Sequence, residues 1–72
     1  MNQSLEKYLT AVDRHLKPLP VSERADIVKE IKSTMLEMES EQMSSKQILD
    51  RLGSPKDLAK AYLKDLLVKE KR

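Results

Sequence analysis

The chain contains no cysteine, tryptophan or phenylalanine, and only one glycine and two tyrosines among its 72 residues. Without cysteine, neither a disulfide nor a thiolate–zinc site can supplement the hydrophobic core. The sequence also lacks an apolar run of membrane-spanning length and does not begin with a signal-peptide pattern. We therefore expect one small domain of cytoplasmic type over residues 1–72, near the lower size limit for a single core.

Candidate catalytic and metal-binding residues are equally scarce. His15 is the only histidine, and a metal site or a nucleophile–base pair needs two or three converging groups. The serines are better explained as helix N-caps, because Ser22, Ser44 or Ser45, and Ser54 all precede expected helices. For the second helix, Pro20 is an equally plausible start. We therefore predict no catalytic, cofactor-binding or metal-binding residue, no cofactor, and a protein that is not an enzyme.

Helix-forming residues dominate what is present, and charged residues make up 36% of the chain. Apolar residues recur at helical spacing, and prolines and serines interrupt them. This pattern predicts a compact all-α bundle of four helices at about residues 3–16, 21–40, 45–52 and 55–69, of which the third is short. In the first two helices the main expected core residues are Leu5, Tyr8, Leu9, Val12, Leu16, Ile27, Ile31, Met35 and Met38. The fourth helix is expected to bury Leu58, Ala59, Tyr62, Leu63 and Leu66, and the hydroxyls of both tyrosines should be exposed.

Gly53, Ser54 and Pro55 predict a corner between the third and fourth helices. Gly53 follows an apolar turn at the position where a left-handed helix cap costs least. Ser54 can accept a hydrogen bond from the first turn of the next helix, and Pro55 suits the first helical position. The corner has a structural role only, and we expect no catalytic or binding role for any of its three residues.

Arg24 is a candidate for a structural ion pair. It lies beside the apolar stripe of the second helix, so its methylenes can cover the core edge while its guanidinium reaches an acidic neighbour. Asp57 is the favoured partner, with Asp65 and Asp13 as the other candidates.

Lys56, Lys60 and Lys64 are four residues apart and should form a basic surface along the fourth helix, continued by Lys69, Lys71 and Arg72. Three interpretations remain open: a solvated face, a helix-turn-helix that binds DNA, and attraction to an anionic membrane. Leu49, four residues before Gly53, and Ser54, just after it, do not fit the usual helix-turn-helix turn. A net charge of +2 also makes nucleic acid an unlikely partner.

Protein partners are favoured instead, because so small a bundle seldom covers every apolar side chain. Leu36 and Leu67 lie toward the edges of their stripes, so we expect self-association or docking through the second and fourth helices. Glu37, Glu39 and Glu41 form either a docking surface for a basic partner or, as we favour, a solvated helix end.

Two segments together resemble a known family. Residues 16–27, LKPLPVSERADI, are similar to the L-x-x-L-P-x-x-E-R-x-x-I opening of the HAAS signalling-domain family, also called DUF1700. Residues 52–55, LGSP, with Leu58 and Ala59, resemble the LGSP…LA corner of that family. The leucine stripe of the first helix fits as well, so the resemblance spans nearly the whole chain.

The resemblance implies a bacterial signalling module. Family members often carry this helical unit on the cytoplasmic side of transmembrane helices, and no catalytic residues are established for them. It therefore implies a cytoplasmic location, membrane proximity through a C-terminal span, and a role in protein interaction. Because the sequence ends at Arg72 without such a span, we expect either an excised cytoplasmic domain or a free-standing relative.

Overall fold

The computed structural model describes the backbone of residues 2–70 and the side chains of residues 2–65. It contains four helices: α1 (Gln3–His15), α2 (Val21–Ser40), α3 (Ser45–Leu52) and α4 (Pro55–Glu70). This confirms the predicted all-α class, and each helix ends within one residue of its predicted bounds. The assignment of all 72 residues to a single domain stays a prediction.

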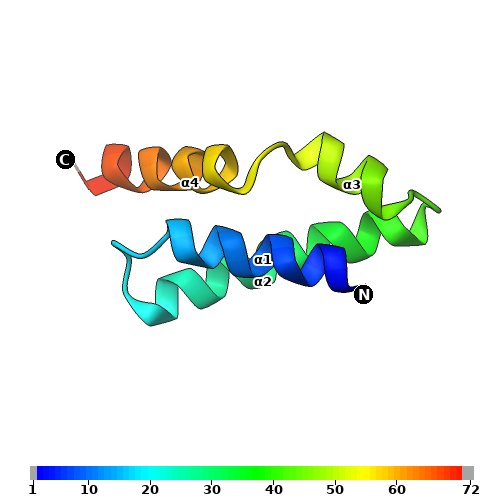
Figure 1. Ribbon diagram of the computed structural model, residues 1–72. Coiled ribbons are helices and arrows are strands. Elements are labelled where there is room, and N and C mark those ends of the chain that lie inside the picture. Colours follow the sequence, from blue (N-terminus) through cyan, green and yellow to red (C-terminus); the bar gives the residue numbers. More distant parts are fainter. Residues whose placement is uncertain (1, 71–72) are drawn as a thin grey trace.

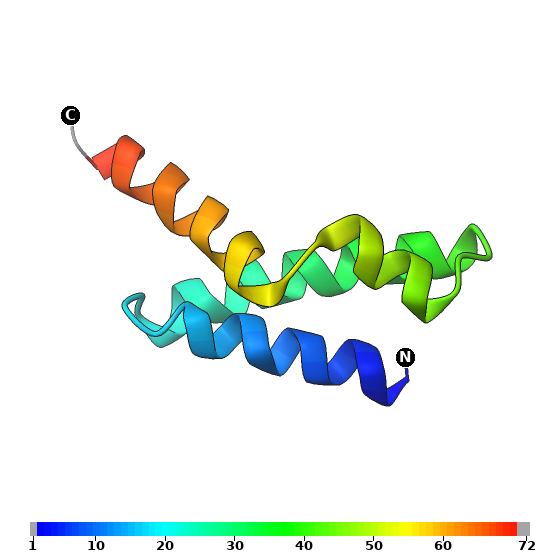
Figure 2. The same cartoon turned by 45° about the horizontal axis from the view of Figure 1, so that its top comes forward.

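The helices form two layers in an elongated molecule measuring 41 × 18 × 17 Å. Helices α1 and α2 lie side by side in one layer, and α3 and α4 follow each other along the second (Figures 1 and 2). Helix α1 contacts all three other helices, whereas α2 and α4 meet only marginally within the described residues. The first helix is therefore the centre of the molecule.

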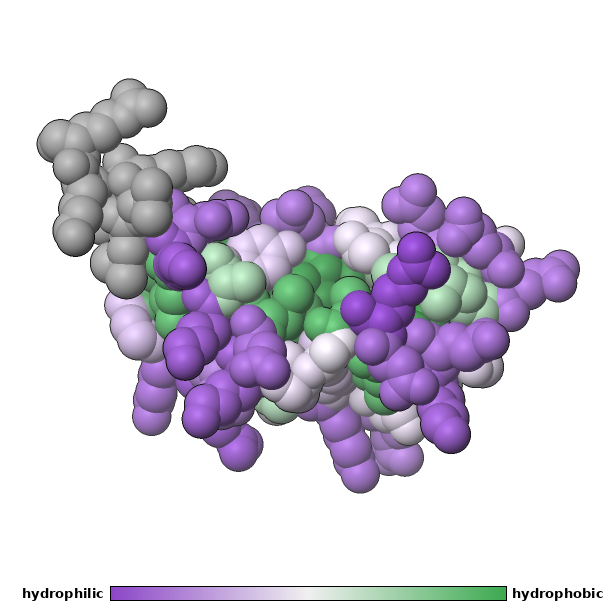
Figure 3. All heavy atoms as spheres, turned by 90° about the horizontal axis from the view of Figure 1, so that it is seen from above, coloured by the Kyte–Doolittle hydropathy of each residue, from purple (hydrophilic) through white to green (hydrophobic). Residues whose placement is uncertain are grey.

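The core reflects this central position. Leu5, Tyr8, Leu9, Val12 and the capping residue Leu16 supply half of the ten residues that are buried among the described side chains. The other half comprises Ile27, Ile31 and Met35 of α2, Ile48 of α3 and Ala59 of α4. Further hydrophobic residues of α3 and α4 are only partly buried, and Figure 3 shows apolar atoms exposed along the middle of the face seen from above. Leu66, which we expected in the core, lies outside the described side chains.

Side-chain caps begin three of the four helices. The Asn2 side chain accepts a hydrogen bond from the Leu5 N–H at 3.0 Å, and Ser44 forms a capping box with Gln47. Ser54 Oγ accepts a hydrogen bond from the Asp57 N–H at 3.1 Å at the start of α4. The prediction for Ser22 was wrong: this residue lies inside α2, which begins after Pro20 without a side-chain cap. The rigid backbone of Pro20 suits this entry, because its φ is held near the helical value.

The end of α2 is closed by backbone hydrogen bonds. The Gln42 N–H donates to the Glu39 carbonyl at 2.9 Å, and the Met43 N–H donates to the Met38 carbonyl at 3.2 Å. Gln42 has a φ of 66°, so these bonds form the Schellman arrangement with glutamine at the position usually held by glycine. The arrangement brings Met43 back against the core, where Met38 also packs.

The break between α3 and α4 depends on an unusual backbone conformation at Gly53. Its φ is 80°, as expected for positive-φ capping, but its ψ of −166° lies far from the left-handed helical region. This combination belongs to a region that is almost exclusive to glycine. A Cβ built on Gly53 would have no atom within 4 Å, so any cost of substitution comes from the backbone alone.

We predict that Gly53→Ala lowers the free energy of unfolding by about 1–3 kcal/mol, and that Gly53→Val lowers it by more because valine is β-branched. Gly53→Asn should cost as much as Gly53→Ala, because asparagine tolerates the left-handed helical region but not this one. Urea unfolding followed by circular dichroism measures all three changes.

Gln42→Gly is the matched control. The φ of 66° at Gln42 is also positive, but glycine there relieves strain, so the free energy of unfolding should rise by roughly 0.5 kcal/mol. Wild-type stability of Gly53→Ala would contradict the assigned backbone conformation.

Candidate interaction surfaces

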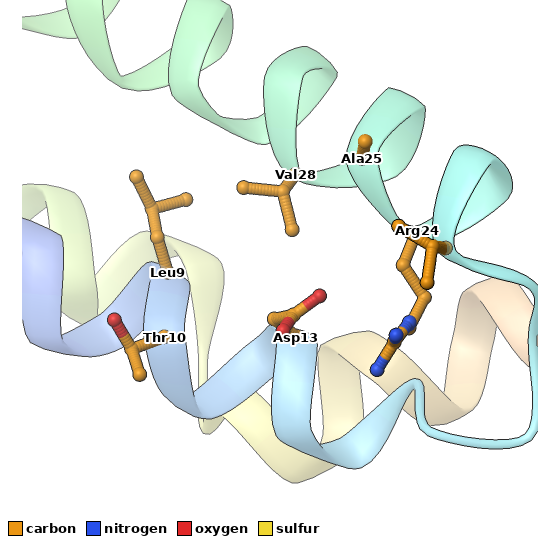
Figure 4. A pocket seen from close by; sticks show the side chains of 7 residues that line it. Leu9, Thr10, Asp13, Arg24, Ala25 and Val28 are labelled. Atoms are coloured by element: carbon orange, nitrogen blue, oxygen red, sulfur yellow. The ribbon is translucent and has the colours of Figure 1, made fainter.

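A groove between α1 and α2 contains the predicted ion-pair residue Arg24. The groove has a volume of about 350 Å³ and is lined by Leu9, Thr10, Asp13, Val21, Arg24, Ala25 and Val28. Figure 4 shows Arg24 on α2 and Asp13 on α1 at the same end of it. The Arg24 Nε atom is buried and has no hydrogen-bond partner among the described groups.

Asp57, the favoured partner of Arg24, lies on α4 and does not line this groove. The negative charge of Asp57 acts instead on Tyr8 of α1, whose pKa it raises. The Arg24–Asp57 pair therefore stays a prediction, and Asp13, one of the other candidates, is the acidic residue that shares a groove with Arg24. The Asp65 side chain is exposed.

Tyr8 differs from our expectation of an exposed hydroxyl. Only 6% of the residue is exposed, and its hydroxyl oxygen is buried without a hydrogen-bond partner among the described groups. Burial raises the pKa of Tyr8 above its ordinary value of 10.0, and the negative charge of Asp57 raises it further. Burial likewise raises the pKa of Tyr62, with a smaller contribution from Glu30 of α2. Both shifts favour the neutral phenols in the folded protein.

The basic surface of α4 gains one residue that the sequence did not connect to it. Lys56, Lys60 and Lys64 are exposed, as a solvated face requires. His15, at the end of α1, lines a shallow hollow together with Lys56, Lys60 and Leu63. These four residues are called the basic patch below. Lys69, Lys71 and Arg72 of the predicted basic strip lie outside the described side chains.

An exposed row of side chains runs along one side of α2, and its first members, Val21 and Ala25, also line the groove between α1 and α2. Val21 is 71% exposed and Leu36 is 47% exposed, and they are the exposed large hydrophobic residues among the described side chains. Ala25, Lys29 and Lys32 are exposed between them at steps of three or four residues, which places all five on one side of the helix. We call this row the outer face of α2. Leu67, the second predicted docking residue, lies outside the described side chains.

The described residues contain no group of three or more metal-ligating side chains. Within the same part of the chain, no helix has both the length and the apolar character needed to cross a membrane. The surface features described above that are candidates for binding are the groove beside Arg24, the basic patch and the outer face of α2.

We predict that Arg24 couples to Asp13 more strongly than to Asp57. A double-mutant cycle with Arg24→Met and Asp13→Asn should give a coupling energy of about 0.5–1 kcal/mol, and the cycle with Asp57→Asn should give about zero. Methionine keeps the apolar stem, so the cycle isolates the charge. Arg14→Met with Asp13→Asn is the control on an exposed face. A larger coupling energy with Asp57 than with Asp13 would contradict this prediction and support the Arg24–Asp57 pair that the sequence favours.

Tyr8 should make folding sensitive to alkaline pH. Because its pKa is raised on folding, its stabilising contribution is complete below the unfolded pKa of about 10 and is lost as pH rises through the folded pKa. Tyr8→Phe should reduce the loss of stability between neutral pH and about pH 11. At neutral pH it should change the free energy of unfolding by less than about 1 kcal/mol, because it removes an unpaired hydroxyl.

Asp57→Asn tests the source of the Tyr8 shift. In a Tyr62→Phe background, phenolate absorbance reports Tyr8 alone, and Asp57→Asn should lower its pKa. A Tyr8 pKa that is the same with and without Asp57 would show that the carboxylate is too distant to act.

Comparison with known proteins gives one match. The family model described as HAAS matches residues 7–61, a range that includes both resembling segments and parts of all four helices. No curated protein and no solved structure matches the chain. The matched range covers well over half of the sequence, and the family suggests a signalling or regulatory module. On this basis, the chain belongs to the HAAS family.

Proposed function

We propose that the protein is a non-catalytic signalling module that acts by binding another protein, and that it forms the cytoplasmic domain of a bacterial membrane protein. Membership of the HAAS family supports a signalling role. The observation that carries the interaction role is the outer face of α2, where Val21 and Leu36 expose apolar surface at both ends of one row.

The chemistry of the outer face indicates the kind of partner. Lys29 and Lys32 lie between the apolar ends of the row, and no acidic residue occupies its centre. A partner helix with two apolar anchors and carboxylates between them would match this order of side chains. Two copies of this face would instead bring their lysines together, so the outer face fits a different protein better than itself.

DNA binding is the second candidate, favoured by the exposed row of Lys56, Lys60 and Lys64 on α4. The short α3, the break at Gly53 and the following helix superficially resemble a helix-turn-helix. However, Asp57 is exposed in the first turn of α4, where it would face the phosphates of bound DNA. Titration with duplex DNA at low and moderate salt decides between the two functions, and a specific site with a steep salt dependence would support DNA binding.

We predict that a photo-crosslinking residue at position 36 captures one discrete protein in the bacterial cell, because the exposed Leu36 lies in the binding face. The same residue at Lys7, an exposed position on α1, is the control. Val21→Ser and Lys29→Glu should each abolish the crosslink while changing the free energy of unfolding by less than about 0.5 kcal/mol. Equal crosslinking from positions 36 and 7 would contradict an interface on α2.

The membrane context has its own test. The codons that follow Arg72 in the parent gene should encode a hydrophobic span, and a stop codon there would remove this part of the proposal.

A further inference from the structure

Two surfaces of opposite charge lie apart along the elongated molecule. The basic patch joins the end of α1 to α4, and its members are His15, Lys56, Lys60 and Leu63. The other surface, here called the acidic groove, lies between α2 and α3 and is lined by Thr34, Glu37, Met38, Glu41, Met43 and Arg51. Figure 1 places the end of α2 at one end of the long axis, and the end of α1 and the first turns of α4 between the middle and the other end.

The two surfaces match in spacing. Lys56 and Lys60 are four residues apart on α4, and Glu37 and Glu41 are four residues apart at the end of α2. All four side chains are exposed. Each pair therefore spans about one helical turn, roughly 5–6 Å, so both lysines can reach both glutamates at once when the helices lie alongside each other.

The apolar parts of the surfaces match as well. Leu63 is partly buried beside the two lysines, while Met38 and Met43 are partly buried beside the two glutamates. Contact between these side chains would remove apolar surface from water next to the ion pairs, and methionine adapts readily to the shape of a partner. The Schellman turn at Gln42 holds Met43 in this position.

We propose that the basic patch of one copy docks in the acidic groove of a second copy, head to tail. Charge complementarity identifies the occupant, because the chain carries both halves of the contact and its net charge of +2 opposes association only weakly. Within one molecule the two surfaces lie apart along the long axis, so each faces solvent. Each docked copy still has one free surface, so the contact does not close and further copies can add.

Arg51 provides a further test of the docking, because it is the one cation among the residues lining the acidic groove. It would repel the incoming lysines. Arg51→Gln should therefore strengthen docking by about two- to fivefold, whereas a contact that does not use this groove would not respond in this way.

The test is analytical ultracentrifugation of the full chain at low and high salt. At low salt the weight-average mass should rise with protein concentration without a plateau at the dimer, and in about 0.5 M salt it should return to the monomer. Lys56→Gln with Lys60→Gln should be monomeric, and so should Glu37→Gln with Glu41→Gln. Lys29→Gln with Lys32→Gln removes the same charge from the outer face of α2 and should associate like the wild type.

Mixing the two monomeric variants gives the decisive result. One retains the acidic groove and the other the basic patch, so the mixture should form a 1:1 dimer and nothing larger. A mixture that stays monomeric, or a wild type that is monomeric at low salt, would overturn the proposal. Association that survives Lys56→Gln with Lys60→Gln but is lost in Val21→Ser with Leu36→Ser would place self-contact on the outer face of α2. That result would overturn head-to-tail docking, and the crosslink from position 36 would then join two copies of the chain instead of capturing a different protein.

Discussion

Burial of the apolar stripe of α1 is the interaction on which the remaining structure depends. Leu5, Val12 and Leu16 are completely buried, and α1 is the helix that contacts all the others. A core of this size leaves little stability in reserve, since each buried leucine or isoleucine contributes about 1.5–3 kcal/mol. Within the described residues, α2 and α4 meet only marginally, and the candidate interaction surfaces lie on exposed sides of these helices and in grooves between neighbouring helices.

The distribution of charge separates those surfaces from one another. Lysines occur along the outer face of α2 and on α4, whereas glutamates gather at the end of α2. Because the basic patch and the acidic groove differ in the sign of their charge, a second copy can approach in one orientation more favourably than in others. The outer face of α2 contains lysines and no acidic residue, so it fits a partner that supplies carboxylates. Both proposals use exposed side chains, so variants that test them should leave the fold intact.

The candidate site could be predicted only in pieces. The spacing of Lys56, Lys60 and Lys64 predicted a row on one helix, because residues four positions apart lie on the same side of a helix. Nothing in the sequence placed His15 beside that row, or Arg51 and Met43 beside Glu37 and Glu41. The hydroxyl of Tyr8 was expected at the surface because tyrosine commonly exposes it, but the packing of α4 against α1 buries it.

The sequence by itself determined the four helices and most of their ends. Asn2, Ser44 and Ser54 cap helices through hydrogen bonds to residues three positions away, so these features need no tertiary contact. Only the tertiary structure decided that α1 would be central, that Arg24 would share a groove with Asp13, and that Gly53 would adopt a ψ of −166° rather than a left-handed helical value. The physical reason is that these outcomes depend on how separate helices divide one small core among themselves, and the period of a single helix carries no information about its neighbours.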